Sequence, residues 1–270
     1  MEALYIIALI KVVICSIILV LTSIEDWRTR EISDAFWVVL GLSGGALTGI
    51  ELLLDYSFTR VISLALSVIA CLALGFILYY VGFFGGADAK CFWCLGIAVP
   101  YNPVQALKLE VLGPQNPIFS VSIFNNSIIT AAALALGIML FNAIKRMHGP
   151  LFSSGEEAKL WKRIMVLMLG YKMRISRLLE KKDFYFPLEE FFINESGVKR
   201  RFRLLTRCID EEAYAKIKEL MDKGVISGQD EIWASPAIPL IVNIALGFFI
   251  ALFYGDLVLT IVKELLGLPL

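Results

Sequence analysis

The chain has 270 residues, 58% of them hydrophobic, and its mean hydropathy is +0.75. A soluble domain of this size would be closer to half apolar. The excess lies in runs of about 20 residues, the length that a helix needs to cross a bilayer core. The 25 Lys and Arg balance the 25 Asp and Glu, and a net charge of zero excludes a basic surface of the kind that binds nucleic acid. We therefore expect an α-helical polytopic protein whose partner is the lipid bilayer.

The apolar runs predict six transmembrane helices, at residues 3–21, 35–54, 61–84, 89–99, 118–144 and 237–259. Each must be helical, because a bilayer core offers no water to pair with backbone amides. The fourth run is short, and we expect it to be tilted or to thin the bilayer locally. Lys11 interrupts the first run. We expect its ammonium group to reach the N-terminal interface, the alternative being that it faces the bundle interior.

The distribution of charged residues predicts that one segment of the chain is soluble. Residues 145–232 hold 18 of the Lys and Arg and 14 of the Asp and Glu. The predicted organisation is therefore five helices in 1–144, a small α+β insert in 145–232 and the sixth helix in 233–270.

Within this insert, 155–170 has the spacing of an amphipathic helix that lies along the membrane or the bundle. Residues 184–205 predict a β-hairpin with its turn at 194–197. Residues 210–223 predict a second helix, with Asp210 as its N-cap and Gly224 as its C-terminal stop.

The cysteines do not predict a metal site. Cys91 and Cys94 have a metal-like spacing, but no second pair accompanies them and the chain's one histidine, His148, is remote in sequence. A structural zinc site needs about four ligands. We interpret the five cysteines as small apolar fillers and expect neither a metal nor another cofactor.

An even number of spans places both termini on one side, and the basic residues that flank the spans indicate which side that is. Five of these residues lie on the face that carries the end of the first helix, and three lie on the other face. The first set is Arg28, Arg30, Lys90, Lys145 and Arg146, and the second is Arg60, Lys108 and Lys263. This difference favours a cytoplasmic first face, which also carries the insert.

The stretch 85–90, Gly-Gly-Ala-Asp-Ala-Lys, lies where a membrane helix should begin. Its small residues would let an extended peptide approach the backbone. Asp88 is an ionisable residue at a helix end, which suggests a functional site; the alternative is that it caps the next helix. Two predicted spans separate Asp88 from Asp26, so both acids should lie on the same side of the membrane.

Two carboxyl groups brought close together share a proton, because both cannot ionise cheaply. One can act as a base that activates water, while the other acts as an acid that protonates a peptide carbonyl. Asp26 and Asp88 thus predict the chemistry of an aspartic protease.

The surroundings of the two acids resemble a known family. Residues 26–32, Asp-Trp-Arg-Thr-Arg-Glu-Ile, are similar to the Asp-x-Arg-x-x-x-Ile segment of the type IV prepilin peptidase superfamily, the Gly-x-Gly-Asp (GxGD) membrane aspartic proteases. Residues 85–90 resemble its second segment, Gly-x-Gly-Asp-x-Lys, with Ala87 in place of the second glycine. Residues 231–239, and the insert before the last span, resemble archaeal preflagellin (prearchaellin) peptidases.

The resemblance implies an endopeptidase at the cytoplasmic face of an archaeal cell membrane. It would remove a short charged leader from archaellin or type IV pilin-like precursors, with Asp26 and Asp88 as the catalytic residues. The residues implied to bind or position substrate are Gly85, Gly86, Ala87, Lys90, Arg28 and Arg30.

The resemblance also separates this chain from the bacterial relatives. Those enzymes also methylate the new N-terminus and carry paired Cys-x-x-Cys motifs between their first spans. This chain has no cysteine there, so we expect no methyltransferase activity.

Two other interpretations remain open. Presenilin-like intramembrane proteases share Gly-x-Gly-Asp but pair it with Tyr-Asp, whereas Glu25 precedes Asp26 here. A proton-coupled carrier could use Asp26 and Asp88 as a relay, although such carriers are usually built from internal repeats and we find none in this sequence.

Overall fold

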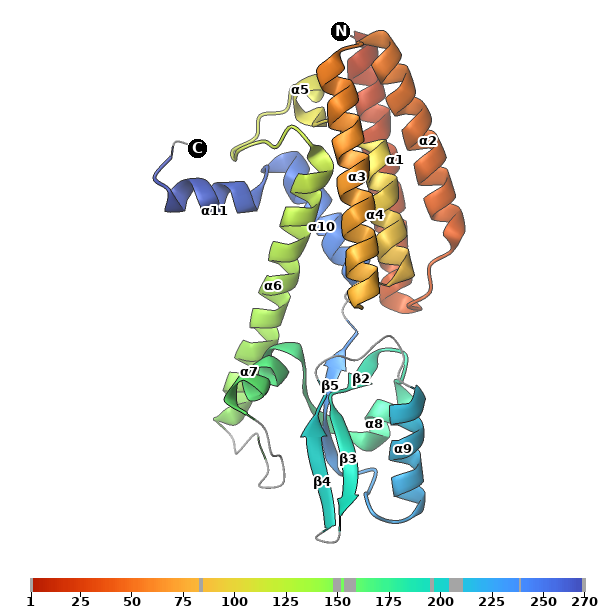
Figure 1. Ribbon diagram of the computed structural model, residues 1–270, viewed down its shortest axis with the longest axis vertical. Helices are drawn as coiled ribbons and strands as arrows, with labels where there is room; N and C mark the ends of the chain where they lie inside the picture. Colours follow the sequence, from red (N-terminus) through yellow and green to blue (C-terminus); the bar gives the residue numbers. More distant parts are fainter. Residues whose placement is uncertain are drawn as a thin grey trace. The chain divides into compact units, whose positions relative to one another are not determined.

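The structure is a computed structural model, and it divides the chain into two compact units (Figure 1). Unit 1 is Met1–Ala131 with Pro239–Leu270, and unit 2 is Ala132–Ile238. The residues that the structure describes are 2–82, 85–147, 152, 159–194, 197–203, 211–237 and 239–268.

Unit 1 is helical. Its elements are α1 (Glu2–Arg28), α2 (Asp34–Leu54), α3 (Phe58–Val81), α4 (Gly86–Ala98), α5 (Pro103–Leu107), the first part of α6 (Phe119–Arg146), α10 (Leu240–Phe253) and α11 (Leu257–Leu265). In Figure 1, α4 runs alongside α1, α2 and α3.

Helices α1, α2, α3 and α6 are long and apolar enough to cross a membrane, and α10 with α11 makes a fifth candidate if the bent pair counts as one span. A mostly helical chain with four or five candidate membrane spans is therefore confirmed among the described residues, but six spans are not. The fourth predicted run forms α4, which has only 13 residues. The last run was predicted as one helix over 237–259, but α10 ends at Phe253 and α11 follows at an angle of 63°.

The bend between α10 and α11 is held by polar side chains of α6. Asp256 is fully buried and caps α11 by accepting the N–H of Leu259. Ser122 Oγ and Asn125 Nδ2 donate to Asp256 Oδ2 over 3.1 and 2.9 Å. Asn126 donates to the carbonyl before Asp256 over 2.8 Å. A straight continuation of α10 would leave these groups without these partners, so tertiary contacts override the apolar pattern.

Helix α4 packs very closely against its neighbours. A Cβ added at Gly44 would lie 2.3 Å from the Cβ of Ala98, and one added at Gly96 would lie 2.8 Å from the Cβ of Cys71. Small residues at such positions let membrane helices approach backbone to backbone. The close fit explains how a helix too short to span alone is accommodated in the bundle.

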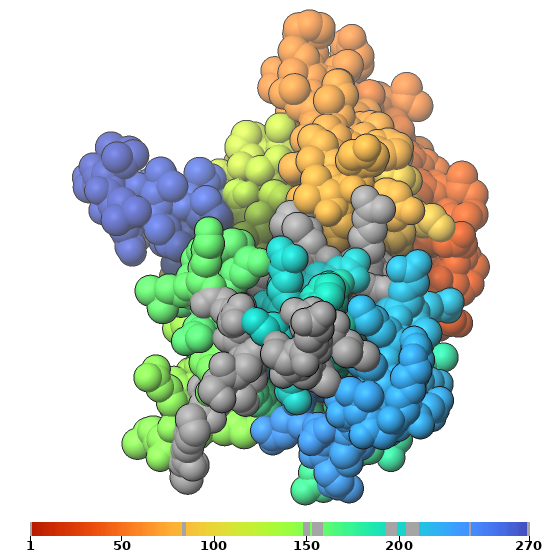
Figure 2. All heavy atoms as spheres, turned by 60° about the horizontal axis from the view of Figure 1, so that its bottom comes forward, coloured from red at the N-terminus to blue at the C-terminus, as the bar shows by residue number. Residues whose placement is uncertain are grey.

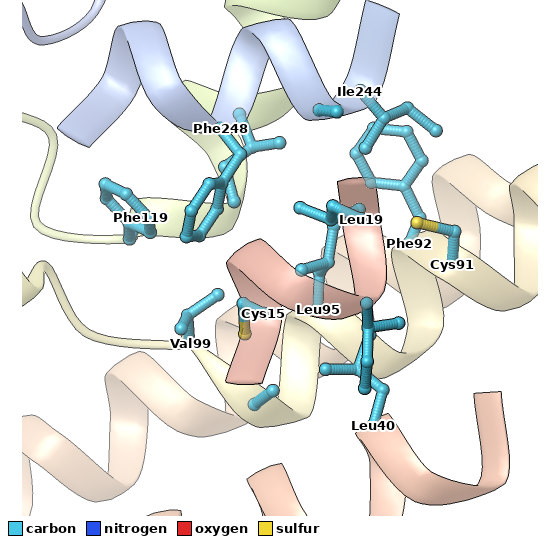
Figure 3. Close-up of a cluster of buried hydrophobic side chains, with 14 of the residues drawn as sticks. Cys15, Leu19, Leu40, Cys91, Phe92, Leu95, Val99, Phe119, Ile244 and Phe248 are labelled. Atoms are coloured by element: carbon cyan, nitrogen blue, oxygen red, sulfur yellow. The ribbon is translucent and has the colours of Figure 1, made fainter. Parts of the chain in front are cut away.

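The core of unit 1 is shown in Figure 3, where side chains from α1, α2, α4, α6 and α10 meet. The labelled residues are Cys15, Leu19, Leu40, Cys91, Phe92, Leu95, Val99, Phe119, Ile244 and Phe248. Cys15, Cys71 and Cys91 are buried in this core with free thiols, as expected of small fillers. Cys94 is only partly buried, and its thiol donates to the carbonyl of Trp37. Cys208 lies outside the described residues.

Lys11 does not reach the interface as we expected. Its side chain is buried, and Nζ donates to Glu51 Oε2 over 2.8 Å. Arg60 binds the other oxygen of Glu51 over 2.8 Å. The prediction was wrong because a buried ammonium group is tolerated where a carboxylate neutralises it, and Glu51 supplies one from α2.

Unit 2 combines short helices and strands. Its elements are the rest of α6, α7 (Leu160–Leu169), β1 (Tyr171–Arg174), α8 (Ile175–Glu180), β2 (Tyr185–Pro187), β3 (Glu189–Asn194), β4 (Gly197–Phe202), α9 (Glu211–Asp222) and β5 (Glu231–Pro236). The strands form an antiparallel sheet of order β1-β5-β2 and a β3-β4 hairpin. Figure 2 shows α9, in light blue, exposed on one face of this unit.

The small α/β region is therefore confirmed, with its hairpin at β3-β4 and helices at α7 and α9. Gly224 follows α9 with a φ of 67°, as a C-terminal stop requires. The predicted N-cap Asp210 and the hairpin turn residues 195–196 lie outside the described residues. Strands β1 and β5 were not predicted. Strand β2 lies within the predicted hairpin, but it pairs with β5 instead.

Candidate active site

Asp26 and Asp88 lie at the same end of the unit 1 bundle, where α1 ends and α4 begins (Figure 1). Their carboxyl groups are close enough to interact electrostatically, and both also interact with Arg30. Two acids separated by 62 positions in the sequence are thus brought together around one guanidinium group.

Arg30 reaches these acids through an unusual backbone conformation. Its φ is 62°, in the left-handed region that non-glycine residues rarely adopt. This turn folds the side chain back toward α1, so that Nη1 lies 3.7 Å from Asp26 Oδ1. Thr29 supports the turn by donating its hydroxyl to the carbonyl of Glu25 over 3.0 Å. Such strain, of about 1 kcal/mol, is typical of functional sites whose surroundings over-determine the backbone.

The other oxygen of Asp26 lacks a hydrogen bond. Oδ2 is buried and accepts none from any described residue. The backbone N–H of Ile241, in the first turn of α10, interacts with this carboxyl group without forming a hydrogen bond of normal geometry. The positive end of a helix therefore faces the acid. We did not predict this contribution of α10, although Pro239 beside the start of the last apolar run could have marked a helix N-terminus there.

Asp88 is held by its own helix start. It is buried, and the N–H of Gly85 donates to Oδ2 over 2.8 Å. Asp88 therefore does cap α4, as the alternative interpretation proposed, and this cap also fixes the direction of the carboxyl group. A Cβ at Gly85 would lie 3.3 Å from Oδ2, so glycine leaves room for the carboxylate.

Gly86 and Ala87 have different surroundings from Gly85. Gly86 is exposed, and a Cβ there would meet nothing within 4 Å. Ala87 is partly buried, and its side chain packs against the hydrophobic core. The methyl group that replaces the motif's second glycine thus fills space in the bundle. Residues 83–84 lie outside the described residues.

The contacts observed for Lys90 and Arg28 do not include Asp26 or Asp88. Lys90 Nζ binds Asp34 Oδ1 over 2.6 Å, in an ion pair that is largely exposed to solvent. Arg28 is exposed at the last position of α1. Of the predicted positioning residues, Arg30 and Gly85 are the two whose contacts with the acids we observe.

The described part of the chain holds no group of three or more His, Cys, Asp and Glu side chains arranged as metal ligands. His148 lies outside it.

Two family models match the chain. The type IV leader peptidase family matches residues 13–141, which include both Asp26 and Asp88, and the archaeal peptidase A24 C-terminus type II model matches residues 162–257.

Three archaeal relatives are similar to the chain over nearly its whole length. The preflagellin peptidase of Methanocaldococcus jannaschii is 27% identical over 96% of this chain and 100% of its own. That of Methanococcus maripaludis is 27% identical over 93% and 97% of the two chains. That of Methanococcus voltae is 25% identical over 90% and 94%.

Proposed function

We propose that this chain, which is similar to the type IV leader peptidase family and to archaeal preflagellin peptidases over nearly its whole length, is a membrane aspartic endopeptidase. Its substrates are archaellin or type IV pilin-like precursors, from which it removes the leader peptide. The observation that carries the proposal is the convergence of Asp26 and Asp88 at one end of the bundle around Arg30.

The two acids divide the hydrolysis between them. One carboxylate takes a proton from water as the water oxygen attacks the peptide carbonyl carbon, and the protonated partner gives its proton to the carbonyl oxygen. The tetrahedral intermediate then collapses and the C–N bond breaks. The first aspartic acid gives the proton that it took from water to the leaving nitrogen, and a hydroxyl group of the intermediate returns a proton to the second aspartate. Arg30 holds the pair in place electrostatically between turnovers.

The substrate reaches this site from the bilayer. A precursor whose own hydrophobic helix lies in the membrane would hold its cleavage site at the depth of the helix ends that carry Asp26 and Asp88. The exposed, open surface at Gly86 leaves space for the extended segment just before that helix. Ala87, Lys90 and Arg28 line the approach in this proposal.

The site is proposed to face the cytoplasm. The end of α1 that carries Asp26 also carries Arg28 and Arg30, and the start of α4 carries Lys90. Cytoplasmic flanks of membrane helices are enriched in such residues. We propose no methyltransferase activity, since the short connection between α1 and α2 holds no cysteine.

Substitution of each acid tests the mechanism. We expect Asp26→Asn and Asp88→Asn each to lower leader removal at least about a hundredfold, because each removes one proton-transfer group. A precursor coexpressed with each variant would be followed by gel shift, and membrane insertion of the variant by immunoblot of the membrane fraction. Cleavage retained by either inserted variant would falsify the mechanism.

Asp34→Asn is the matched control. It removes a nearby carboxylate whose partner is Lys90, in a pair too exposed to contribute much stability, so activity should persist. Loss of activity in Asp34→Asn would instead reassign the first acid. Mass spectrometry of the new N-terminus then locates the cut: before the hydrophobic segment for a leader peptidase, or within it for a presenilin-like protease.

A further inference from the structure

Unit 2 contains a cavity of about 530 Å³ that the proposed peptidase chemistry does not use. It is formed by the end of α6, β1, α8 and the start of β5. Its lining residues include five cations and two acids. The cations are Lys145, Lys172, Arg174, Arg177 and Lys181, and the acids are Glu180 and Glu231.

Glu180 and Glu231 lie among the cations of this cavity, but three of the cationic side chains form no ion pair with these acids. Arg174, Arg177 and Lys181 are exposed, and no ion pair joins them to another of the described residues. Lys145 Nζ donates only weakly, to the carbonyl of Lys172 over 3.4 Å. A cavity with an excess of three positive charges attracts an anion, and guanidinium groups match the oxygens of phosphate.

One side of the cavity is apolar. Phe141 and Tyr171 line it and contact each other edge to face, with ring centroids 5.8 Å apart. Met173 continues this side. A ligand that fits both sides carries an anionic group and an apolar part, which distinguishes a lipid from a free inorganic anion.

The end of α6, which lines the cavity, has the residue pattern of a helix that leaves a bilayer. The apolar residues Leu140, Phe141 and Ile144 are exposed on α6 directly before Lys145, as on a helix that leaves a bilayer. A cation at this point meets the headgroup layer.

Helix α7 also has the features of a helix at the membrane–water interface. It exposes apolar side chains, Leu160 and Trp161 among them, and tryptophan is enriched at membrane–water boundaries. The carbonyls of Leu167 and Gly170, at its C-terminal end, accept hydrogen bonds of 2.9 and 2.7 Å from Asn142 of α6. The end of α6 and an amphipathic helix are thereby fixed together at one level.

We propose that this cavity binds the phosphate headgroup of an anionic membrane lipid, with the first part of the lipid's chains along Phe141. The site holds the soluble unit against charged lipid. It is independent of leader cleavage.

The test uses the full-length protein, reconstituted with equal amounts of phosphatidylglycerol and phosphatidylcholine and then released for native mass spectrometry. We expect preferential retention of phosphatidylglycerol. Arg174→Gln combined with Arg177→Gln should weaken that retention at least about tenfold, because it removes two of the cations that attract the anionic headgroup.

Lys216→Gln combined with Lys218→Gln is the control, since it removes two charges from α9, none of whose residues lines the cavity. It should retain the lipid preference, and circular dichroism should show both double variants folded. Equal retention of the two lipids, equal loss in both variants, or complete displacement of phosphatidylglycerol by millimolar inorganic phosphate or by an acidic peptide would each overturn the proposal.

Discussion

Adjacent glycines at the start of α4 have opposite local roles. Gly85 lies against the carboxyl group of Asp88, where an added Cβ would be 3.3 Å from Oδ2, whereas Gly86 faces open space. Neither glycine has a positive φ. The two glycines therefore differ in the space around a Cβ atom. Alanine at position 85 tests packing around Asp88, and alanine at position 86 tests the space left for a substrate.

Gly85→Ala should lower leader cleavage about tenfold, because a displaced carboxyl group is misaligned for proton transfer. Gly86→Ala should leave the fold unchanged but raise KM if the substrate backbone passes there. The cleavage rate and KM of both variants are measured with a purified precursor, and the melting temperature of each variant shows whether it is folded. Full activity in Gly85→Ala would show that the close contact does not position Asp88.

Arg30 and Glu51 show how a buried charge acquires a role from its neighbours. Arg30 accepts a left-handed backbone and thereby reaches both acids. Glu51 binds Lys11 and Arg60 near the opposite end of α1 and α2. The second cluster lies away from the acids, and we interpret it as a link among three helices, since breaking a buried pair leaves an uncompensated charge.

The element that most depends on its neighbours is α4. Its last turn ends beside α2 and α3, where the carbonyls of a helix C-terminus need donors and lipid provides none. Thr48 Oγ1 donates to the carbonyl of Ile97 over 2.9 Å and to that of Ala98 over 3.2 Å. Ser67 Oγ donates to the carbonyl of Gly96 over 2.8 Å. Side chains of two spans therefore cap the short helix.

Thr48→Val should lower the free energy of unfolding by about 1–3 kcal/mol, because a nearly isosteric side chain leaves buried carbonyls without a donor. The measurement is the melting temperature of the purified protein in detergent. Ser43→Ala is the control, since Ser43 donates only to the carbonyl of Val39 in its own exposed turn. Equal effects of the two substitutions would contradict a capping role for Thr48.

Unit 2 has its own internal constraint at α9. Burial raises the pKa of Tyr214 to about 12, so its hydroxyl remains a donor at neutral pH. It donates to the carbonyl of Tyr185 in β2, which ties α9 to the sheet. The amphipathic pattern of 210–223 predicted the helix, but this partner lies 29 positions away.

For the whole molecule, α2 has the length and composition of a membrane span, and the two ends of such a helix lie on opposite sides of the bilayer. Thr29, before α2, lies at the end that carries Asp26, and Tyr56, after α2, lies at the other end. Both residues are exposed. The proposed cytoplasmic site therefore requires these two positions to differ in access from outside the cell.

In intact cells, a membrane-impermeant maleimide should label Tyr56→Cys but not Thr29→Cys, each in a background with Cys208→Ser. Permeabilised cells should show labelling of both. The reverse pattern would place the acids on the outer face and exclude a cytoplasmic leader peptidase.

Much of this protein could be predicted from sequence because its signals are local. Runs of about 20 apolar residues predict membrane helices at α1, α2, α3 and α6, and the burial of Cys15, Cys71 and Cys91 follows from their apolar surroundings. The number of intervening spans and the two motifs also selected Asp26 and Asp88, which the structure brings to one end of the bundle; their catalytic role stays a prediction.

The tertiary structure decided what depends on distant partners. The length of α4, the 63° bend before α11, the pairing of Lys11 with Glu51 and the approach of the α10 N-terminus to Asp26 each involve groups far apart in the chain. Within a bilayer, every buried polar group must find a partner inside the protein. Because those partners come from other helices, hydropathy predicts where a helix lies, while packing decides where it ends and what its charged residues meet.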